Sequence, residues 1–151
     1  MKNPFGRRNR GSKSLEDYAA FEYILLGDLG DLLEEPADKH THRWLLAVLD
    51  ALVDTIPREF QMKSREGYLS EVLNEYPSWY RHVEYLRAEH HELYANLRDL
   101  RGRIAAREEY EESADRVRID LRDWMARLVA HHHHENRLVQ TAINLEVGTG
   151  D

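Results

Sequence analysis

Two side chains that could bind a metal ion lie near the C-terminal end of the sequence, where four consecutive histidines precede ENRLVQ. Successive residues of an α-helix turn by about 100°, which places His131 and Glu135 on one face. The apolar residues of that face are Trp124, Leu128 and Leu138. A buried carboxylate is costly unless it is paired or bound to metal. The spacing therefore predicts a metal site or a buried hydrogen-bonded network.

Three further polar residues, Glu22, Glu59 and His90, fall in the apolar stripes of other predicted helices. At a rise of about 1.5 Å per residue, antiparallel packing brings His90 to the level of Glu59 and of His131. Facing helices that carry imidazole and carboxylate groups bind iron, manganese or zinc. The predicted metal ligands are His90, His131, Glu135 and Glu59.

The predicted axial position of Glu22 agrees less well with the level shared by Glu59, His90 and His131. Counted from the proline at position 36, it lies opposite residue 50, roughly 13 Å from Glu59 along the axis. A kink or an end loop would have to absorb that offset. His40 and His42 flank Thr41 at a predicted helix start and are interpreted as helix-start residues rather than ligands.

The remaining histidines of the run differ in their predicted direction. His132 and His133 point away from the apolar stripe and are predicted to be solvated. His134 lies at the margin of the stripe, where it is predicted to support a ligand through a hydrogen bond.

These side chains require helices to position them, and apolar residues recur at helical spacing along most of the chain. Prolines mark the joints: Pro36 ends the first helix, Pro77 starts a new one, and Pro57 either kinks a helix or separates two short ones. The polar segment AAREEYEESAD links the last two helices, and the glycines of EVGTGD stop the last one. The fold class is all-α, an up-down four-helix bundle with helices near 15–35, 39–76, 78–106 and 114–145.

Composition limits the class of protein. A chain of 151 residues predicts one domain, 15–148, after a basic and disordered N-terminal arm, 1–14. The net charge of −7 argues against general nucleic-acid binding. No apolar run is long enough for a membrane span, and the N-terminus is not typical of a secretory signal. The absence of cysteine excludes disulfides and thiolate ligands and fits a cytoplasmic location.

Three blocks of the sequence resemble the hemerythrin-like cation-binding family over most of the chain from about residue 15. EFQMKSREGYLSEVL is similar to the second-helix block of that family, LRAEHHELYANLRDL to its third, and HHHHENRLVQTAINLEVGTGD to its fourth. The resemblance implies a hemerythrin-like bundle in which His90, His131 and Glu135 keep the ligand types of the family. Such proteins typically hold non-haem di-iron that binds oxygen or senses oxygen, nitric oxide or iron.

The chain departs from the family pattern at three positions. Glu59 stands where the second-helix histidine is expected, and Lys63 stands where a bridging carboxylate is expected. The first helix offers Glu22 or Tyr23 in place of a histidine. A lysine ammonium repels a metal cation, and an ion pair with Glu59 or Glu135 would replace the metal charge with its own.

Three functional hypotheses are compatible with these residues. The first is a metal-binding bundle that holds mononuclear or dinuclear non-haem iron, with zinc or manganese as alternatives, and that takes up a diatomic ligand or stores or senses metal. The second is a metal-free interaction or regulatory module, with Lys63 in place of metal and with Trp44, Trp79 and Tyr80 as candidates for a partner or homodimer surface. The third, a metal-dependent enzyme, is the least favoured, since no hydrolase, nucleotide or dinucleotide motif occurs.

Overall fold

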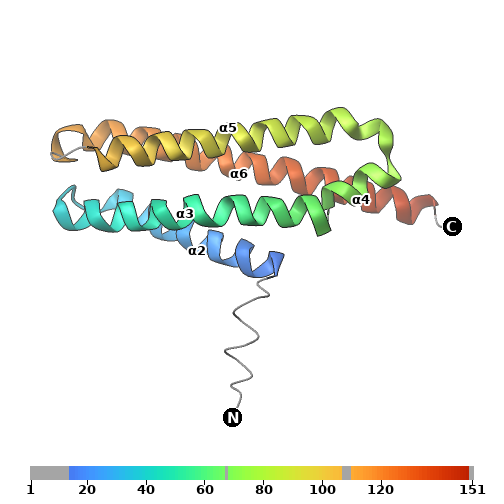
Figure 1. Cartoon of the computed structure of the whole chain (residues 1–151), viewed down its shortest axis with the longest axis horizontal. Helices are drawn as coiled ribbons and strands as arrows, with labels where there is room; N and C mark the ends of the chain where they lie inside the picture. Colours follow the sequence, from blue (N-terminus) through green and yellow to red (C-terminus); the bar gives the residue numbers. More distant parts are fainter. Residues whose placement is uncertain (1–13, 67, 107–109, 150–151) are drawn as a thin grey trace, which may run out of the picture.

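A computed structural model of the chain describes residues 14–66, 68–106 and 110–149. These residues form α2 (Leu15–Glu34), α3 (Lys39–Glu66), α4 (Tyr68–Glu75), a 3-10 turn η1 (Pro77–Trp79), α5 (Tyr80–Ala105) and α6 (Tyr110–Thr149) (Figure 1). No strand occurs within those ranges, which confirms the predicted all-α class. The arm predicted for residues 1–14 lies outside the described residues except for Ser14.

Local side-chain caps set the start of the first two helices. The Ser14 hydroxyl accepts from the backbone N–H of Asp17, whose carboxylate accepts from the N–H of Ser14 in return. This reciprocal pair satisfies two donors that the first helical turn leaves free. The Asp38 carboxylate similarly accepts from the N–H of Thr41 at 2.8 Å. α2 ends at Glu34, before Pro36, as predicted.

Three predicted boundaries are wrong. The helix predicted over 39–76 is divided into α3 and α4, and residue 67 between them lies outside the described residues. Of the two alternatives for Pro57, the separation of two short helices is wrong, because Pro57 lies inside α3. α6 begins at Tyr110 and runs to Thr149, so much of the predicted polar linker is helical and Gly148 does not end the helix. Polar composition alone does not exclude a helix, because glutamate and alanine are good helix formers.

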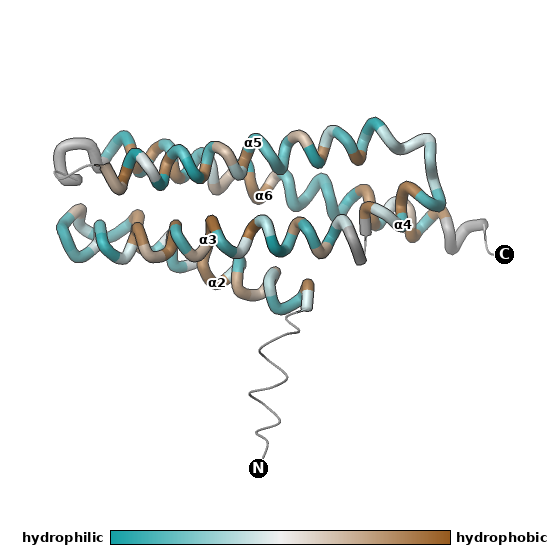
Figure 2. Tube along the Cα trace, in the orientation of Figure 1, coloured by the Kyte–Doolittle hydropathy of each residue, from teal (hydrophilic) through white to brown (hydrophobic). Residues whose placement is uncertain are grey.

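The four long helices pack as neighbours around shared apolar faces. α3 contacts α2 and α5, and α6 contacts α5 and α2. α2 runs obliquely to α3, whereas α5 and α6 extend along most of the molecule (Figure 1). Apolar and polar residues alternate along each long helix at intervals of a turn or less, as expected for helices with one buried face (Figure 2). No helix in the described ranges is both long and apolar enough to cross a membrane.

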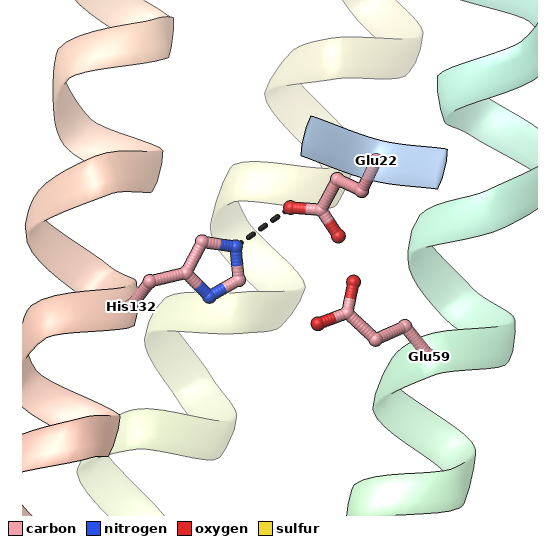
Figure 3. Close-up of side chains that lie close together, drawn as sticks. All are labelled: Glu22, Glu59 and His132. Carbon is pink, nitrogen blue, oxygen red and sulfur yellow. Dashed lines mark hydrogen bonds and ion pairs between the residues drawn. The ribbon is translucent and has the colours of Figure 1, made fainter. Parts of the chain in front are cut away.

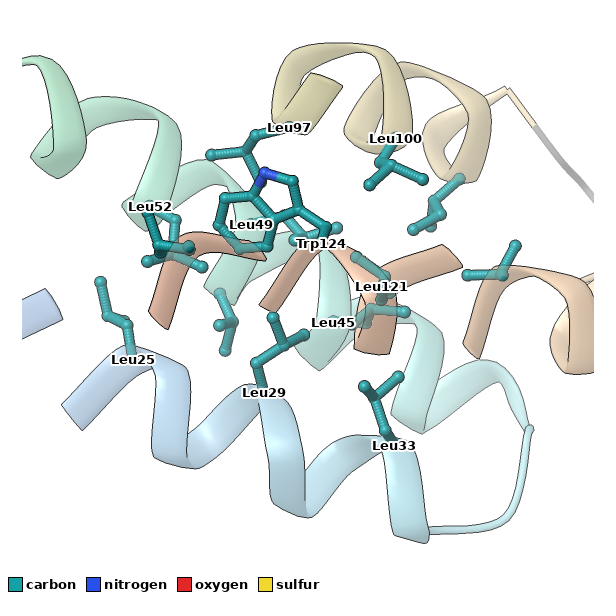
Figure 4. Close-up of a cluster of buried hydrophobic side chains, with 14 of the residues drawn as sticks. Leu25, Leu29, Leu33, Leu45, Leu49, Leu52, Leu97, Leu100, Leu121 and Trp124 are labelled. Atoms are coloured by element: carbon teal, nitrogen blue, oxygen red, sulfur yellow. The ribbon is translucent and has the colours of Figure 1, made fainter. Parts of the chain in front are cut away.

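Buried apolar residues form two clusters. The larger one surrounds Trp124, which is 2% exposed and donates its indole N–H to the carbonyl of Leu93 at 2.9 Å (Figure 4). It draws leucines from α2, α3, α5 and α6. The smaller one joins α4 to α5 and α6 through Leu69, Val83 and Ala142. The residues between these clusters on α3, α5 and α6 include the polar ones singled out by the sequence.

Leu121 is fully buried in the larger cluster, so its truncation measures how much that cluster contributes to the free energy of unfolding. We expect Leu121→Ala to lower the free energy of unfolding by about 3 kcal/mol, because it removes buried methyl groups and leaves a cavity. Ile119→Ala on the same helix is the matched control, since Ile119 is 58% exposed, and should change stability by less than about 1 kcal/mol. Urea unfolding followed by circular dichroism measures both; equal losses would contradict the packing described.

Candidate metal centre

A polar layer separates the two apolar clusters. It contains the five polar residues that the sequence placed in apolar stripes, and each is at most 8% exposed: Glu22, Glu59, His90, His131 and Glu135. Their burial confirms the helical stripe assignment. Their grouping concentrates carboxylates and imidazoles in a region of low solvent access, where each requires a partner.

Lys63 lies at the centre of this layer. Its ammonium is 2.9 Å from Glu59 Oε1 and 3.2 Å from Glu135 Oε1, and its side chain is only 14% exposed. The ion pair proposed from the sequence for either glutamate is therefore formed with both. One ammonium holds one oxygen of each carboxylate and links α3 to α6.

His132 lies against the polar layer, so the prediction that it is solvated is wrong. Its Nε2 is 2.6 Å from Glu22 Oε1 and its Nδ1 is 3.1 Å from Glu135 Oε1, and its side chain is 30% exposed. The apolar stripe that leads to His131 faces α5, but α6 also contacts α2. A helix with two neighbours buries a wider arc than one stripe, and the next residue along falls within that arc.

The hydrogen bonds of His132 alter two pKa values. Burial disfavours the imidazolium, but the hydrogen bonds to Glu135 and Glu22 outweigh it and raise the pKa of His132 to about 9. Burial also opposes ionisation of Glu135, but the hydrogen bond from His132 and the charge of Lys63 prevail and lower its pKa to about 2. At neutral pH the layer thus holds an imidazolium beside an ionised Glu135.

The carboxylates of Glu22 and Glu59 lie close together, so the axial offset predicted between them by counting from Pro36 is wrong. Ligand atoms of Glu22, Glu59 and His132 all lie within 4.8 Å of one another, and their side chains converge from α2, α3 and α6 (Figure 3). The axial count assumes parallel rods, whereas α2 crosses α3 obliquely (Figure 1). Each glutamate side chain also spans several ångströms, which takes up the remaining offset.

In each of these two glutamates, one carboxylate oxygen is paired and the other is not. Glu22 Oε1 contacts His132, and Glu59 Oε1 contacts Lys63. Glu22 Oε2 and Glu59 Oε2 are buried and lack a hydrogen-bond partner among the described residues. A cavity of about 10 Å³ lies beside them, bordered also by Lys63, His132 and Glu135. That volume accommodates roughly one water-sized occupant.

His90 and His131 are held in other ways. The His90 ring stacks on Phe60 with centroids 3.7 Å apart and planes 9° from parallel, and its centroid is 6.0 Å from that of His131. Burial lowers the pKa of His90 to about 3, with help from the charge of His131. His131 Nδ1 is 2.6 Å from Glu89 Oε1. Its Nε2 is 3.3 Å from Glu135 Oε1, without the alignment of a hydrogen bond, and has no hydrogen-bond partner among the residues that the structure describes.

Within the described ranges, the group of His, Asp and Glu residues close enough to share one ion is Glu22, Glu59 and His132. Of the four predicted ligands, that group contains Glu59; the other three lie in the same polar layer around it. Glu89 is not evident from the sequence, because it lies at the edge of the stripe of α5 and is only one residue before His90. His134, predicted to support a ligand, has Nδ1 3.7 Å from Glu89 Oε1 and is half exposed.

A groove of about 560 Å³ connects this layer to the surface between α2 and α6. Its walls are mainly apolar, from residues such as Leu26, Val129 and Val139, and Glu22, Glu59, Lys63 and His132 also line it. The polar layer is therefore accessible to small solutes. His42, by contrast, bonds to the carbonyl of Ile104 at 3.0 Å, near the end of α5, in agreement with a helix-start role.

Comparison with known proteins finds no relative: no family model matches the chain, and no curated protein or solved structure is significantly similar to it. Of the aromatic residues named for a partner surface, Trp44 and Tyr80 are exposed, whereas Trp79 is half-buried and stacks on Tyr76. The homodimer stays a prediction. The functional assignment therefore rests on the chemistry of the polar layer.

Proposed function

We propose that the chain is a hemerythrin-like up-down bundle that binds a divalent metal ion within the polar layer. The favoured metal is non-haem iron. The observation that supports this is the pair of buried, unpartnered oxygens on Glu22 and Glu59, beside a cavity of about 10 Å³. An unsatisfied buried carboxylate oxygen is costly. One cation between the two oxygens would satisfy both.

The charges of the layer also favour a further cation. Three carboxylates, those of Glu22, Glu59 and Glu135, meet two cationic groups, Lys63 and the His132 imidazolium. A buried group of charges with a net negative sum attracts a positive ion, because screening by water is weak there. Carboxylate and imidazole ligands together suit iron, manganese and zinc, and the resemblance to the hemerythrin-like family favours iron among them.

A bound metal would supply open coordination positions, and the groove between α2 and α6 would give a diatomic ligand a route to them. We therefore assign oxygen, nitric oxide or metal sensing or storage as the class of function, by analogy with hemerythrin-like proteins.

Metal content per chain tests this proposal. Untagged protein is stripped with chelator, reloaded anaerobically with Fe²⁺ and passed through a desalting column. We expect near-stoichiometric iron, and a large loss in Glu59→Gln, because Glu59 belongs to both the predicted ligand set and the observed group. His133→Ala is the control for adventitious binding, since His133 is exposed. Wild-type protein without retained iron, or iron unaffected by Glu59→Gln, would refute metal binding in the layer.

The metal-free interaction module is the second candidate, and the position of Lys63 supports it. The ammonium already neutralises one oxygen of Glu59 and one of Glu135, as a metal would. Absence of retained metal in the wild-type protein would make this module the better account. The exposed Trp44 and Tyr80 would then be the first residues to test for a partner.

A further inference from the structure

We infer that the ion is held by Glu22, Glu59 and His132, one ligand from each of α2, α3 and α6, and that a single ion is bound. This inference rests on the proposed function and specifies its site. It differs from the ligand set implied by the family resemblance, which takes His131 rather than its neighbour.

The side chains of the three ligands point toward one another (Figure 3), and contacts outside the group hold one atom of His132 and one of Glu59. His132 keeps Nδ1 on Glu135 and presents Nε2 to Glu22. Glu59 keeps Oε1 on Lys63 and leaves Oε2 buried and unpartnered. A carboxylate on the far nitrogen of a ligand histidine fixes its ring, which is the usual support of metal-binding imidazoles.

Glu22 completes the group. Its Oε1 meets His132 Nε2 at 2.6 Å, and its Oε2 is buried without a partner. An ion bound between Glu22 and Glu59 would displace the Nε2 proton of His132 to solvent, because a ligand nitrogen must be deprotonated, and would take the place of the contact between Glu22 and the imidazole. The carboxylate, being only 3% exposed, has few other ways to be satisfied.

Within the described residues, the alternative ligands lie outside this group. Glu135 Oε1 already faces Lys63 at 3.2 Å and His132 at 3.1 Å, so two donors occupy that oxygen. His131 Nδ1 is bound to Glu89, and its buried Nε2 faces Glu135 at 3.3 Å rather than Glu22 and Glu59. The His90 ring is stacked on Phe60. The Lys63 ammonium already takes one oxygen from each of Glu59 and Glu135, which leaves fewer carboxylate oxygens for a second ion. The geometry therefore favours one ion per chain.

The neighbouring histidines provide a matched test with Mn²⁺ as the probe, because free Mn²⁺ is counted directly by its electron paramagnetic resonance signal. We expect one Mn²⁺ per chain in the wild type. We expect roughly 100-fold weaker binding or worse in His132→Ala, since loss of a mere supporting group already costs about 10- to 100-fold. His131→Ala should bind within a few-fold of the wild type.

Glu22→Gln and His90→Gln form a second pair, in case truncation of a buried histidine prevents folding, which circular dichroism checks. Glu22→Gln should lose the ion and His90→Gln should keep it. The reverse pattern, with binding lost in His131→Ala and His90→Gln but kept in His132→Ala and Glu22→Gln, would overturn the inference and leave the proposed function intact. A wild type that binds no Mn²⁺ and retains no iron would refute both, and two Mn²⁺ per chain would refute the single-ion site.

Discussion

Replacing Lys63 by methionine should destabilise the metal-free protein by about 3–5 kcal/mol, since removal of one partner leaves buried charges uncompensated. Its ammonium contacts Glu59 and Glu135, which are 6% and 7% exposed at their side chains. Methionine keeps most of the apolar length of lysine, so the change tests charge rather than volume. Urea unfolding in the presence of chelator gives the free energy of unfolding.

Arg101→Met is the control for loss of an ion pair between helices. Arg101 on α5 is 2.7 Å from Asp50 on α3, but the two side chains are 42% and 54% exposed. Solvent screening limits such a pair to less than about 1 kcal/mol. If Lys63→Met costs no more than Arg101→Met, the buried ion pairs described for the polar layer are not a feature of the folded protein.

The same substitution bears on the two candidate functions. In a metal-binding bundle, saturating Mn²⁺ should stabilise Lys63→Met more than the wild type, because the variant lacks the ammonium that repels the ion beside Glu59. In a metal-free module, Mn²⁺ should not change the loss of unfolding free energy caused by Lys63→Met. Unfolding with and without the ion therefore separates the two accounts through stability alone.

Helical periodicity is sufficient to find the buried polar residues. His131 and Glu135 are buried beside Leu128, and His90 is buried between Leu86 and Leu93, as their spacing predicts. The reason is that side-chain direction along a helix depends only on the number of residues between positions. Periodicity within one helix does not carry information about how neighbouring helices are tilted.

That missing information accounts for the two errors at the site. The axial count puts Glu22 too far from Glu59 because it cannot include the oblique course of α2. The apolar stripe predicts a solvated His132 because it represents only part of the buried face of α6, whose adjoining arc is covered by α2. His132 would be found by a search for histidines that lie about 100° around the helix from a buried stripe, on the side that faces a second neighbouring helix.

Acidification should destabilise the metal-free protein strongly, and His90 is the main reason. Burial, together with the charges of His131, His91 and Lys63, holds its pKa at about 3 against the opposing charge of Glu135. Between pH 6.5 and 3 the unfolded chain therefore binds a proton at this residue that the folded chain does not. Stability falls as the pH falls through that window, by about 1.4 kcal/mol per pH unit and by up to about 5 kcal/mol in all.

Below pH 4.5, Glu135 adds to this loss. Its pKa of about 2 means that it stays ionised in the folded protein while the unfolded chain takes up a proton. The stability that this carboxylate contributes is present above pH 4.5 and is lost as the pH falls toward 2. Acid unfolding should therefore steepen below pH 4.5.

Alkaline pH should act through His132 with the opposite sign. Its pKa of about 9 makes the folded protein bind a proton that the unfolded chain has lost above pH 6.5. That contribution is complete below pH 6.5 and is lost as the pH rises to 9, by up to about 3 kcal/mol. The two limbs meet near pH 6.5, where the metal-free protein should be most stable.

Urea unfolding across this pH range, with chelator present, measures the profile, and two variants assign its limbs. His90→Gln should flatten the fall between pH 6.5 and 4.5 while leaving the alkaline limb, because glutamine does not titrate. His132→Gln should remove the alkaline limb and keep the fall between pH 6.5 and 4.5, which belongs to His90. It should also weaken the steepening below pH 4.5, because the hydrogen bond from His132 is what chiefly lowers the pKa of Glu135. A wild-type stability that stays constant or rises from pH 6.5 to 5 would mean that His90 is solvated, which would contradict its burial against Phe60 in the folded protein.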